Sequence, residues 1–307
     1  AEARRYGIRV FGPNCQGTIN TDAAHRAYCN FTNTMPQPGS ISLAALSGGV
    51  GGLILQGLAD TGVGLRMYAS NGNACDVSIA EILRYWGDDD ATRAGVLYTE
   101  GFADPRAFLE VASDVAARKP VLAMKAGRTE QGAKAASSHT GSLAGVDIAT
   151  ELIFEKTGIL SFRDEGELVR AALAFATQPI PRGPRVAILA NTGGPAVIAT
   201  DALVAEGLEV PPLSAVSVER LRGALLPQAA LTNPVDVVAT AGAEHFRAAI
   251  EVLQDDPDID ALYLNFVTPS FTDTQAIARE IVAAAKKRSK PIVCNLMTDL
   301  TQERFRA

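Results

Sequence analysis

The sequence is poor in cysteine, histidine and tryptophan. Its 307 residues include four cysteines, three histidines and one tryptophan. The cysteines show no C-x-x-C spacing and no metal-ligand cluster, so we expect neither a disulfide framework nor a metal site. Their pattern is typical of reduced thiols, which indicates a cytoplasmic protein.

Long apolar runs and runs of basic residues are also missing. No stretch is apolar over the roughly 20 residues that a membrane-spanning helix needs. The net charge is −6 and the pI is about 5.2, and no basic patch interleaved with aromatic residues offsets this balance. We therefore expect no nucleic-acid partner and no membrane partner.

The remaining composition is that of an ordinary globular protein. A hydrophobic share of 47% and a charged share of 20% allow a sizeable core, and the length suggests two domains. The chain begins at Ala1 without an initiator methionine and stops just after Arg306, so we expect a piece of a longer protein.

Strand-like and helix-like patterns alternate through the first half of the chain. Buried-strand runs cover residues 41–46, 64–69, 94–98 and 120–125, with helical patterns between them. This order predicts a parallel sheet with helices on both faces and no antiparallel pairing. Before it we expect a helix tail, a short strand at 8–11 and a polar linker over 21–39.

The same series of landmarks then occurs a second time. Four features recur in the same order, and the separation between matched residues grows steadily, as loop insertions in a duplicated fold would produce. The matched pairs are Gly48 with Gly193, Asp76 with Asp236, the acidic stretch 88–90 with 255–257, and Lys119 with Lys290. We therefore predict an α/β protein with two tandem flavodoxin-like, doubly wound parallel-sheet domains, at 36–180 and 183–307.

Each predicted domain has a glycine-rich turn between its first strand and the following helix. These turns are Ser47-Gly48-Gly49 and Thr192-Gly193-Gly194. Unpaired backbone N–H groups and the helix dipole make such a helix start a candidate phosphate site. The first turn has neither the spacing of a P-loop nor a convincing dinucleotide fingerprint.

His139 lies in a run of small residues, Ser137 to Gly145, in the first domain. Imidazole is a nucleophile near neutral pH and a leaving group once phosphorylated, so this loop suits phosphoryl relay, although a structural histidine is the alternative. Glu100 follows a predicted strand and would hydrogen-bond the ring, or be a solvated strand-end carboxylate. The second domain has Val267 in place of Glu100 and no histidine loop.

A further loop, Gly12-Pro13-Asn14-Cys15, follows the predicted strand at 8–11. Ligands of α/β sheets bind outside the carboxyl ends of strands, whereas the plainer interpretation is a connecting turn.

Together with Tyr98-Thr99-Glu100-Gly101, these motifs resemble the ADP-forming (NDP-forming) acyl-CoA synthetases, relatives of succinyl-CoA synthetase. The resemblance covers essentially the whole chain. It implies that residues 1–35 are the C-terminal remnant of a CoA-binding Rossmann domain, and that an ATP-grasp unit, holding ATP/ADP with Mg²⁺, lies outside this chain as a partner domain or subunit.

The resemblance also implies a role for each motif. His139 would be transiently phosphorylated and Glu100 would orient it. Ser47-Gly48-Gly49 and Thr192-Gly193-Gly194 would grip the phosphoryl group, and Gly12 to Cys15 would lie near the CoA thiol. The chain would then be the CoA-ligase portion of an oligomeric acid–thiol ligase, inactive by itself.

Two other classes of function are weighed against this one. A non-catalytic regulatory or scaffold module would be expected to lose the histidine, yet His139 and Glu100 are both present. A flavodoxin-type FMN carrier would need aromatic loops, and neither glycine-rich turn is followed by one. The acid stays open: acetate, a branched or aryl acid, a hydroxycinnamate such as ferulate, and a dicarboxylate all fit.

Overall fold

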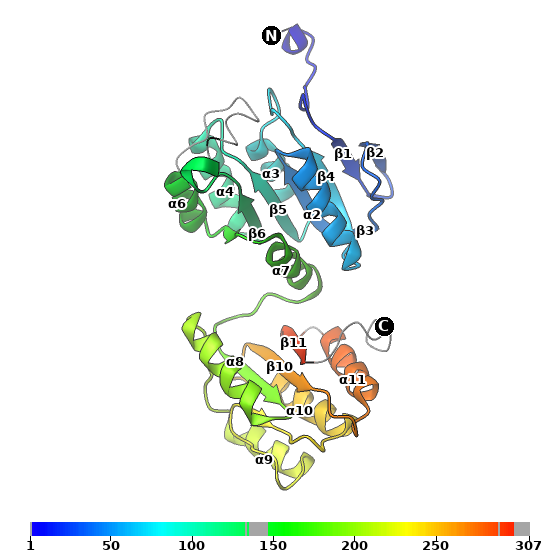
Figure 1. The fold of residues 1–307 in the computed structure, drawn as a ribbon, viewed down its shortest axis with the longest axis vertical. Helices are drawn as coiled ribbons and strands as arrows, with labels where there is room; N and C mark the ends of the chain where they lie inside the picture. Colours follow the sequence, from blue (N-terminus) through cyan, green and yellow to red (C-terminus); the bar gives the residue numbers. More distant parts are fainter. Residues whose placement is uncertain (1, 133, 135–146, 288, 298–307) are drawn as a thin grey trace. The chain divides into compact units, whose positions relative to one another are not determined.

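The computed structural model describes residues 2–132, 134, 147–287 and 289–297, and the chain divides into two compact units, Ala1–Thr177 and Gln178–Ala307 (Figure 1). The first unit contains α1 (Glu2–Arg5), β1 (Gly17–Asn20), β2 (Ala27–Asn30), β3 (Pro38–Ala45), α2 (Gly48–Asp60), β4 (Leu65–Ser70), α3 (Ile79–Gly87), β5 (Ala94–Thr99), α4 (Pro105–Ala116), β6 (Val121–Lys125), α6 (Asp147–Thr157), β7 (Leu160–Phe162) and α7 (Glu165–Thr177). The second contains β8 (Val186–Ala190), α8 (Gly193–Ala205), α9 (Ala215–Ala224), β9 (Val235–Asp236), α10 (Ala243–Asp255), β10 (Ala261–Val267), α11 (Thr274–Lys286) and β11 (Ile292–Met297).

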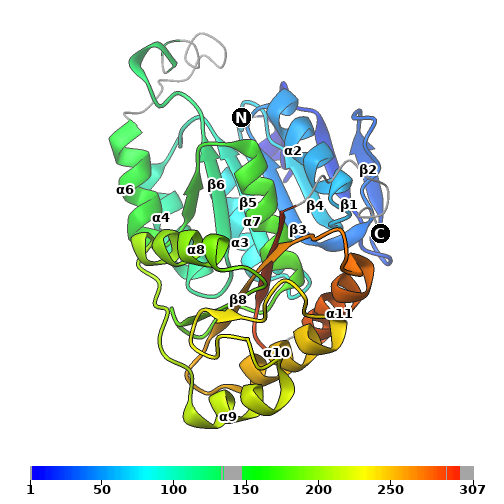
Figure 2. The same ribbon diagram turned by 60° about the horizontal axis from the view of Figure 1, so that its bottom comes forward.

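The sheet of the first unit has the strand order β2-β1-β4-β3-β5-β6-β7. Its five strands from β4 to β7 are parallel and follow the flavodoxin order 2-1-3-4-5, as predicted. Helices α2 and α7 pack together on one face, and α3, α4 and α6 cover the other (Figure 2). Two hydrophobic clusters result, one on each side of the sheet.

The N-terminal region differs from the prediction. Residues 8–11 belong to no strand. Residues 17–20 and the first part of the expected linker together form the hairpin β1–β2, whose strand β1 pairs antiparallel with β4. The expectation of purely parallel pairing is therefore wrong at this edge. Ile19, the central apolar residue of β1, is 4% exposed, so the hairpin does contribute to the core. Four-residue strands with one buried apolar side chain carry too little periodicity to be recognised.

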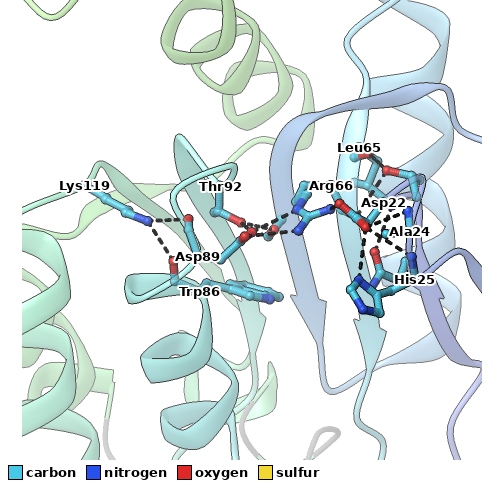
Figure 3. Close-up of polar contacts among 12 residues, drawn as sticks. Asp22, Ala24, His25, Leu65, Arg66, Trp86, Asp89, Thr92 and Lys119 are labelled. Carbon is cyan, nitrogen blue, oxygen red and sulfur yellow. Dashed lines mark hydrogen bonds and ion pairs between the residues drawn. The ribbon is translucent and has the colours of Figure 1, made fainter.

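One arginine fixes this hairpin to the sheet (Figure 3). The Arg66 guanidinium donates to Asp22 Oδ2 at 2.7 Å, and to both carboxylate oxygens of Asp89 at 3.0 and 3.1 Å. The hydrogen bond from Arg66 holds the pKa of Asp22 below its usual range. Arg66 thus connects the turn after β1 to the loop before β5.

The second unit has a four-stranded sheet, ordered β11-β10-β8-β9, whose named strands pair in parallel. An isolated antiparallel bridge also joins Ala230 to Asp236 of β9. Helices α9, α10 and α11 pack on one face around the larger hydrophobic cluster. Ala196 and Ala199 of α8 pack with Ile188 and Ala190 on the other face. The order again places the first strand, β8, between the second and the third.

The predicted duplication extends to individual hydrogen bonds. In the first unit Lys119 Nζ donates to the carbonyl oxygens of Trp86 and Asp89, at 2.9 and 2.6 Å. In the second, Lys290 Nζ donates to the carbonyl oxygens of Leu253 and Asp256. Each lysine precedes a strand and binds the carboxyl end of a helix, where a cation is favoured.

Candidate functional site

The predicted site residues of the first unit lie at the carboxyl edge of its sheet. Ser47 follows β3 and Glu100 follows β5, and these two strands are hydrogen-bonded neighbours. In the order 2-1-3-4-5 the chain reverses direction across the sheet between these strands, which is where doubly wound sheets bind ligands. Glu100 is 8% exposed, so this strand-end residue is buried.

Helix α2 begins directly at the glycine-rich turn, with Gly48 as its first residue. Ser47 is its N-cap and accepts a hydrogen bond from the backbone N–H of Val50 at 3.5 Å. A Cβ at Gly49 would meet open space, whereas one at Gly48 would lie 2.8 Å from Gln16 Cγ. One at Gly51 would lie 2.6 Å from Tyr68 Oη. Gly49 therefore leaves room for a ligand, and the other two allow close packing.

The loop Gly12-Pro13-Asn14-Cys15 contacts the loop that follows β4. The backbone N–H of Asn73 donates to Pro13 O, and that of Cys75 donates to Gly12 O, both at 3.0 Å. A Cβ at Gly72 would overlap the carbonyl oxygen of Pro13, so glycine is required there. The structure thus brings this loop to the carboxyl edge that holds Ser47 and Glu100.

The loop 12–15 is held in place by three residues that were not predicted to belong to the site: Asp76, Gln16 and Tyr68. Asp76, predicted only as a landmark of the repeat, accepts from the backbone N–H of Val10 and from Arg9 Nε, both at 2.9 Å. It also accepts from Arg4 Nη2 at 3.0 Å. The backbone hydrogen bond from Val10 and the arginines keep the pKa of Asp76 well below its usual range.

Gln16 and Tyr68 are the other two. The Tyr68 hydroxyl donates to Gln16 Oε1 at 2.8 Å, and the Gln16 backbone N–H donates to Ser70 Oγ at 3.0 Å. Burial raises the pKa of Tyr68 to about 12, so the hydroxyl stays a donor at physiological pH. The position of Gln16, directly after the predicted site residue Cys15, is the one feature of the sequence that could have indicated its role.

The glycine-rich turn of the second unit also lies at the carboxyl edge of its sheet. Thr192 is the N-cap of α8 but accepts no side-chain capping hydrogen bond. A Cβ at Gly193 would lie 3.7 Å from Asp236 Oδ2, and one at Gly194 would meet open space. Asn191 joins the ends of β8 and β10 by two hydrogen bonds with the backbone of Val267, at 2.8 and 3.0 Å.

His139 and its loop lie outside the described residues, so the role of His139 stays a prediction. Beside Glu100 the structure contains a cavity of about 370 Å³. Burial, and secondly the charge of Glu100, raise the pKa of neighbouring Tyr98 to about 12.

The described part of the chain contains no cluster of three or more His, Cys, Asp or Glu side chains suited to a metal ion. No helix within it has the length and apolarity to cross a membrane.

Each unit thus has a doubly wound sheet and a helix that begins at a glycine-rich turn at the carboxyl edge of that sheet, which defines an α/β protein of the flavodoxin-like class. Residues 38–175 match the family described as succinyl-CoA ligase like flavodoxin domain, and residues 186–306 match the ligase-CoA domain. The chain belongs to the ADP-forming acyl-CoA synthetase family, related to succinyl-CoA synthetase.

Individual relatives agree with this membership. The alpha subunit of an ADP-forming acetate–CoA ligase II from Pyrococcus furiosus is 38% identical over 307 residues, covering 98% of this chain and 66% of the relative. A 4-hydroxybutyrate–CoA ligase (ADP-forming) from Nitrosopumilus maritimus is 30% identical, over 96% of this chain and 42% of the relative. Acetyl-coenzyme A synthetase 1 of Ca. Korarchaeum cryptofilum, solved with phosphate and ADP, superposes with a TM-score of 0.91 at 30% identity, over 98% of this chain and 68% of that one. The chain thus spans about two thirds or less of these relatives.

Proposed function

We propose that the chain is the CoA-ligase portion of an ADP-forming acyl-CoA synthetase, which makes acyl-CoA from a carboxylic acid, CoA and ATP. The observation that carries the proposal is the meeting of three predicted features at one sheet edge: buried Glu100, the open helix start at Gly49, and the docked loop 12–15. ATP, with Mg²⁺, would bind to an ATP-grasp domain or subunit that this chain does not include.

The proposed reaction passes a phosphoryl group through His139. The γ-phosphoryl group of ATP is transferred to an imidazole nitrogen, and ADP leaves. A carboxylate oxygen of the acid then attacks the phosphorus, which frees the imidazole and gives an acyl phosphate. The CoA thiolate attacks the acyl carbon, so the C–O bond breaks and inorganic phosphate leaves.

Each predicted site residue has a role in this series of reaction steps. Glu100 accepts a hydrogen bond from one ring nitrogen of His139 and leaves the other as nucleophile. Each glycine-rich helix start, Ser47-Gly48-Gly49 in the first unit and Thr192-Gly193-Gly194 in the second, offers backbone N–H groups that bind phosphoryl charge without a lysine, and phosphohistidine carries about two negative charges. The loop 12–15 positions the CoA thiol.

The proposal is tested by phosphoryl labelling in the presence of an ATP-grasp partner. Incubation with ATP and Mg²⁺ is expected to give an acid-labile, base-stable label that His139→Ala abolishes together with acyl-CoA formation. Glu100→Gln is expected to slow labelling about a hundredfold, as for a lost proton or orientation partner. His25→Ala is the matched control, because this histidine side chain is 81% exposed and lies in the β1–β2 turn. Full acyl-CoA synthesis by the His139→Ala protein would refute the relay and favour the regulatory module.

A further inference from the structure

The start of α8 differs from the start of α2 in the residue that lies beside it. In the first unit, Ser70 ends β4 and pairs with the last residue of β3, and its Oγ would lie 3.6 Å from a Cβ at Gly48. In the second unit, Asp236 ends β9 and pairs with the last residue of β8, and its Oδ2 would lie 3.7 Å from a Cβ at Gly193. The repeated fold therefore has a neutral hydroxyl at one helix start and a carboxylate at the other.

Asp236 forms no ion pair with the described residues. Its Oδ1 accepts from the backbone N–H of Val238 at 2.9 Å, which fixes the carboxylate in place. The positive end of the α8 dipole favours this negative charge. A fully ionised anion at the same helix start would lie close to the Asp236 carboxylate and be repelled by it.

A second acceptor lies beside the first turn of α8. Asn265 of β10 is 4% exposed, and its Nδ2 donates to the carbonyl oxygen of Pro195, the third residue of α8, at 3.4 Å. Because that carbonyl can only accept, the amide is oriented with Oδ1 as its other polar atom, and this atom has no hydrogen-bond partner within the described part of the chain. A buried acceptor without a partner costs free energy, so the site is suited to a ligand that brings a donor.

The start of α8 also offers donors. Its N-cap Thr192 accepts no capping hydrogen bond, and Pro195 has no N–H group that could make one. The N–H groups of Gly193 and Gly194 belong to the first turn, where a helix provides no partner of its own, and a Cβ at Gly194 would meet open space. This helix start therefore offers both donors and acceptors to a ligand.

A tetrahedral anion with one protonated oxygen matches this mixture of groups. Inorganic phosphate keeps at least one P–O–H group at neutral pH, which can donate to Asp236 or Asn265 while the ionised oxygens accept from the helix start. Sulfate has the same shape but no proton, so it would leave both acceptors unpaired and be repelled by Asp236. The neutral Ser70 beside α2 imposes no such requirement.

We propose that the start of α8 binds inorganic phosphate through its protonated oxygen, and that Asp236 selects this ligand over a fully ionised anion. The inference rests on the proposed function for its place in the reaction, in which phosphate leaves when the CoA thiolate attacks the acyl phosphate. The phosphoryl group of phosphohistidine, with about two negative charges, is by the same reasoning better suited to the start of α2.

The test follows the backbone amide signals of Gly193 and Gly194 by NMR while phosphate or sulfate is added to the 307-residue chain near neutral pH. We expect phosphate to shift both signals saturably and sulfate to bind there at least about tenfold more weakly. Asp236→Asn keeps the acceptor for the Val238 N–H and adds a donor for sulfate, so it should fold. In this variant we expect the affinities for the two anions to differ by less than about threefold.

Asp201→Asn, the same change at an exposed position of α8, is the matched control and should keep the preference for phosphate. The proposal would be overturned by an absence of phosphate-dependent shifts at Gly193 and Gly194, which would leave Asp236 as a partner of the helix dipole alone. Equal affinities for phosphate and sulfate in the unaltered chain would also overturn it, as would equal effects of Asp236→Asn and Asp201→Asn. Because neither ATP nor CoA is present, these results are independent of whether His139 is phosphorylated.

Discussion

Asp76 connects the N-terminal segment to the first unit through one carboxylate. Replacing it with asparagine removes the charge that binds Arg4 and Arg9 while nearly preserving its shape. We expect Asp76→Asn to loosen the loop 12–15 and to speed hydrogen exchange at the backbone N–H groups of Asn73 and Cys75, which donate to that loop. Asp90→Asn, at an exposed position of the same unit, is the control. Unchanged exchange in Asp76→Asn would show that the backbone contacts suffice.

The same carboxylate predicts a pH dependence. The pKa of Asp76 is lowered in the folded protein, so its contribution is fully present above the ordinary aspartate pKa of about 3.9 and is lost as the pH falls below it. We expect the relative protection of the Asn73 and Cys75 amides, corrected for intrinsic exchange rates, to fall as the pH drops from about 4 toward the lowered pKa of Asp76. In Asp76→Asn this pH response should be absent. An equal response in both proteins would assign the effect to other carboxylates.

At the scale of single residues, the sequence predicts the loop 12–15 but does not identify the residues that hydrogen-bond to it. Gly, Pro and Asn in succession predict a constrained turn at 12–14, and the structure has positive φ angles of 92° at Gly12 and 54° at Asn14. The partners of the loop lie far along the chain: Tyr68 is 52 positions after Gln16, and Asp76 is 66 positions after Val10. Local patterns carry no information on such pairs. The roles of His139 and Glu100 were inferred from residue chemistry and from the family resemblance, and they stay predictions.

At the scale of elements, the glycines of α2 have different roles. We therefore expect alanine substitutions at Gly51 and Gly49 to change the free energy of unfolding in opposite directions. In Gly51→Ala the new Cβ would lie 2.6 Å from Tyr68 Oη and 2.7 Å from Ala45 Cβ, so we expect a loss of about 1–3 kcal/mol by overpacking. In Gly49→Ala it would meet open space, so the free energy of unfolding should rise by up to about 1 kcal/mol. Urea denaturation of both variants checks this. Equal destabilisation would contradict the distinction.

In the first unit the central strands were predictable from the sequence, whereas the edge strands were not. Runs such as 41–46 and 94–98 are apolar at nearly every position because helices cover both faces of the strands they form. By contrast, β1, β2 and β7 have only three or four residues, and β2 and β7 are largely exposed. Such strands form because a neighbouring strand offers unpaired backbone groups, which is a property of the assembled sheet.

At the scale of the whole molecule, each sheet and each hydrophobic cluster lies within a single unit. We therefore expect residues 1–177 produced alone to unfold cooperatively in denaturant, with a circular dichroism spectrum typical of an α/β domain. A gradual, non-cooperative transition of this fragment would contradict the expectation.

The duplication itself was visible in the sequence because its landmarks have structural causes. Lys119 and Lys290 recur because each binds two carbonyl oxygens at the end of a helix, in both cases including that of an aspartate. The hairpin has no counterpart among the described strands of the second unit, so no repeat could reveal it.

The hairpin β1–β2 also bears on how the first unit avoids association with other chains. It covers the outer edge of β4 and ends the sheet in a strand of only four residues, a poor template for further pairing. The matched flavodoxin-like domain begins at residue 38, so a protein cut to that boundary would lose the hairpin. The six-residue edge of β4 would then be open to pairing, and such a truncated protein is expected to aggregate through β-sheet extension where the longer chain stays monodisperse.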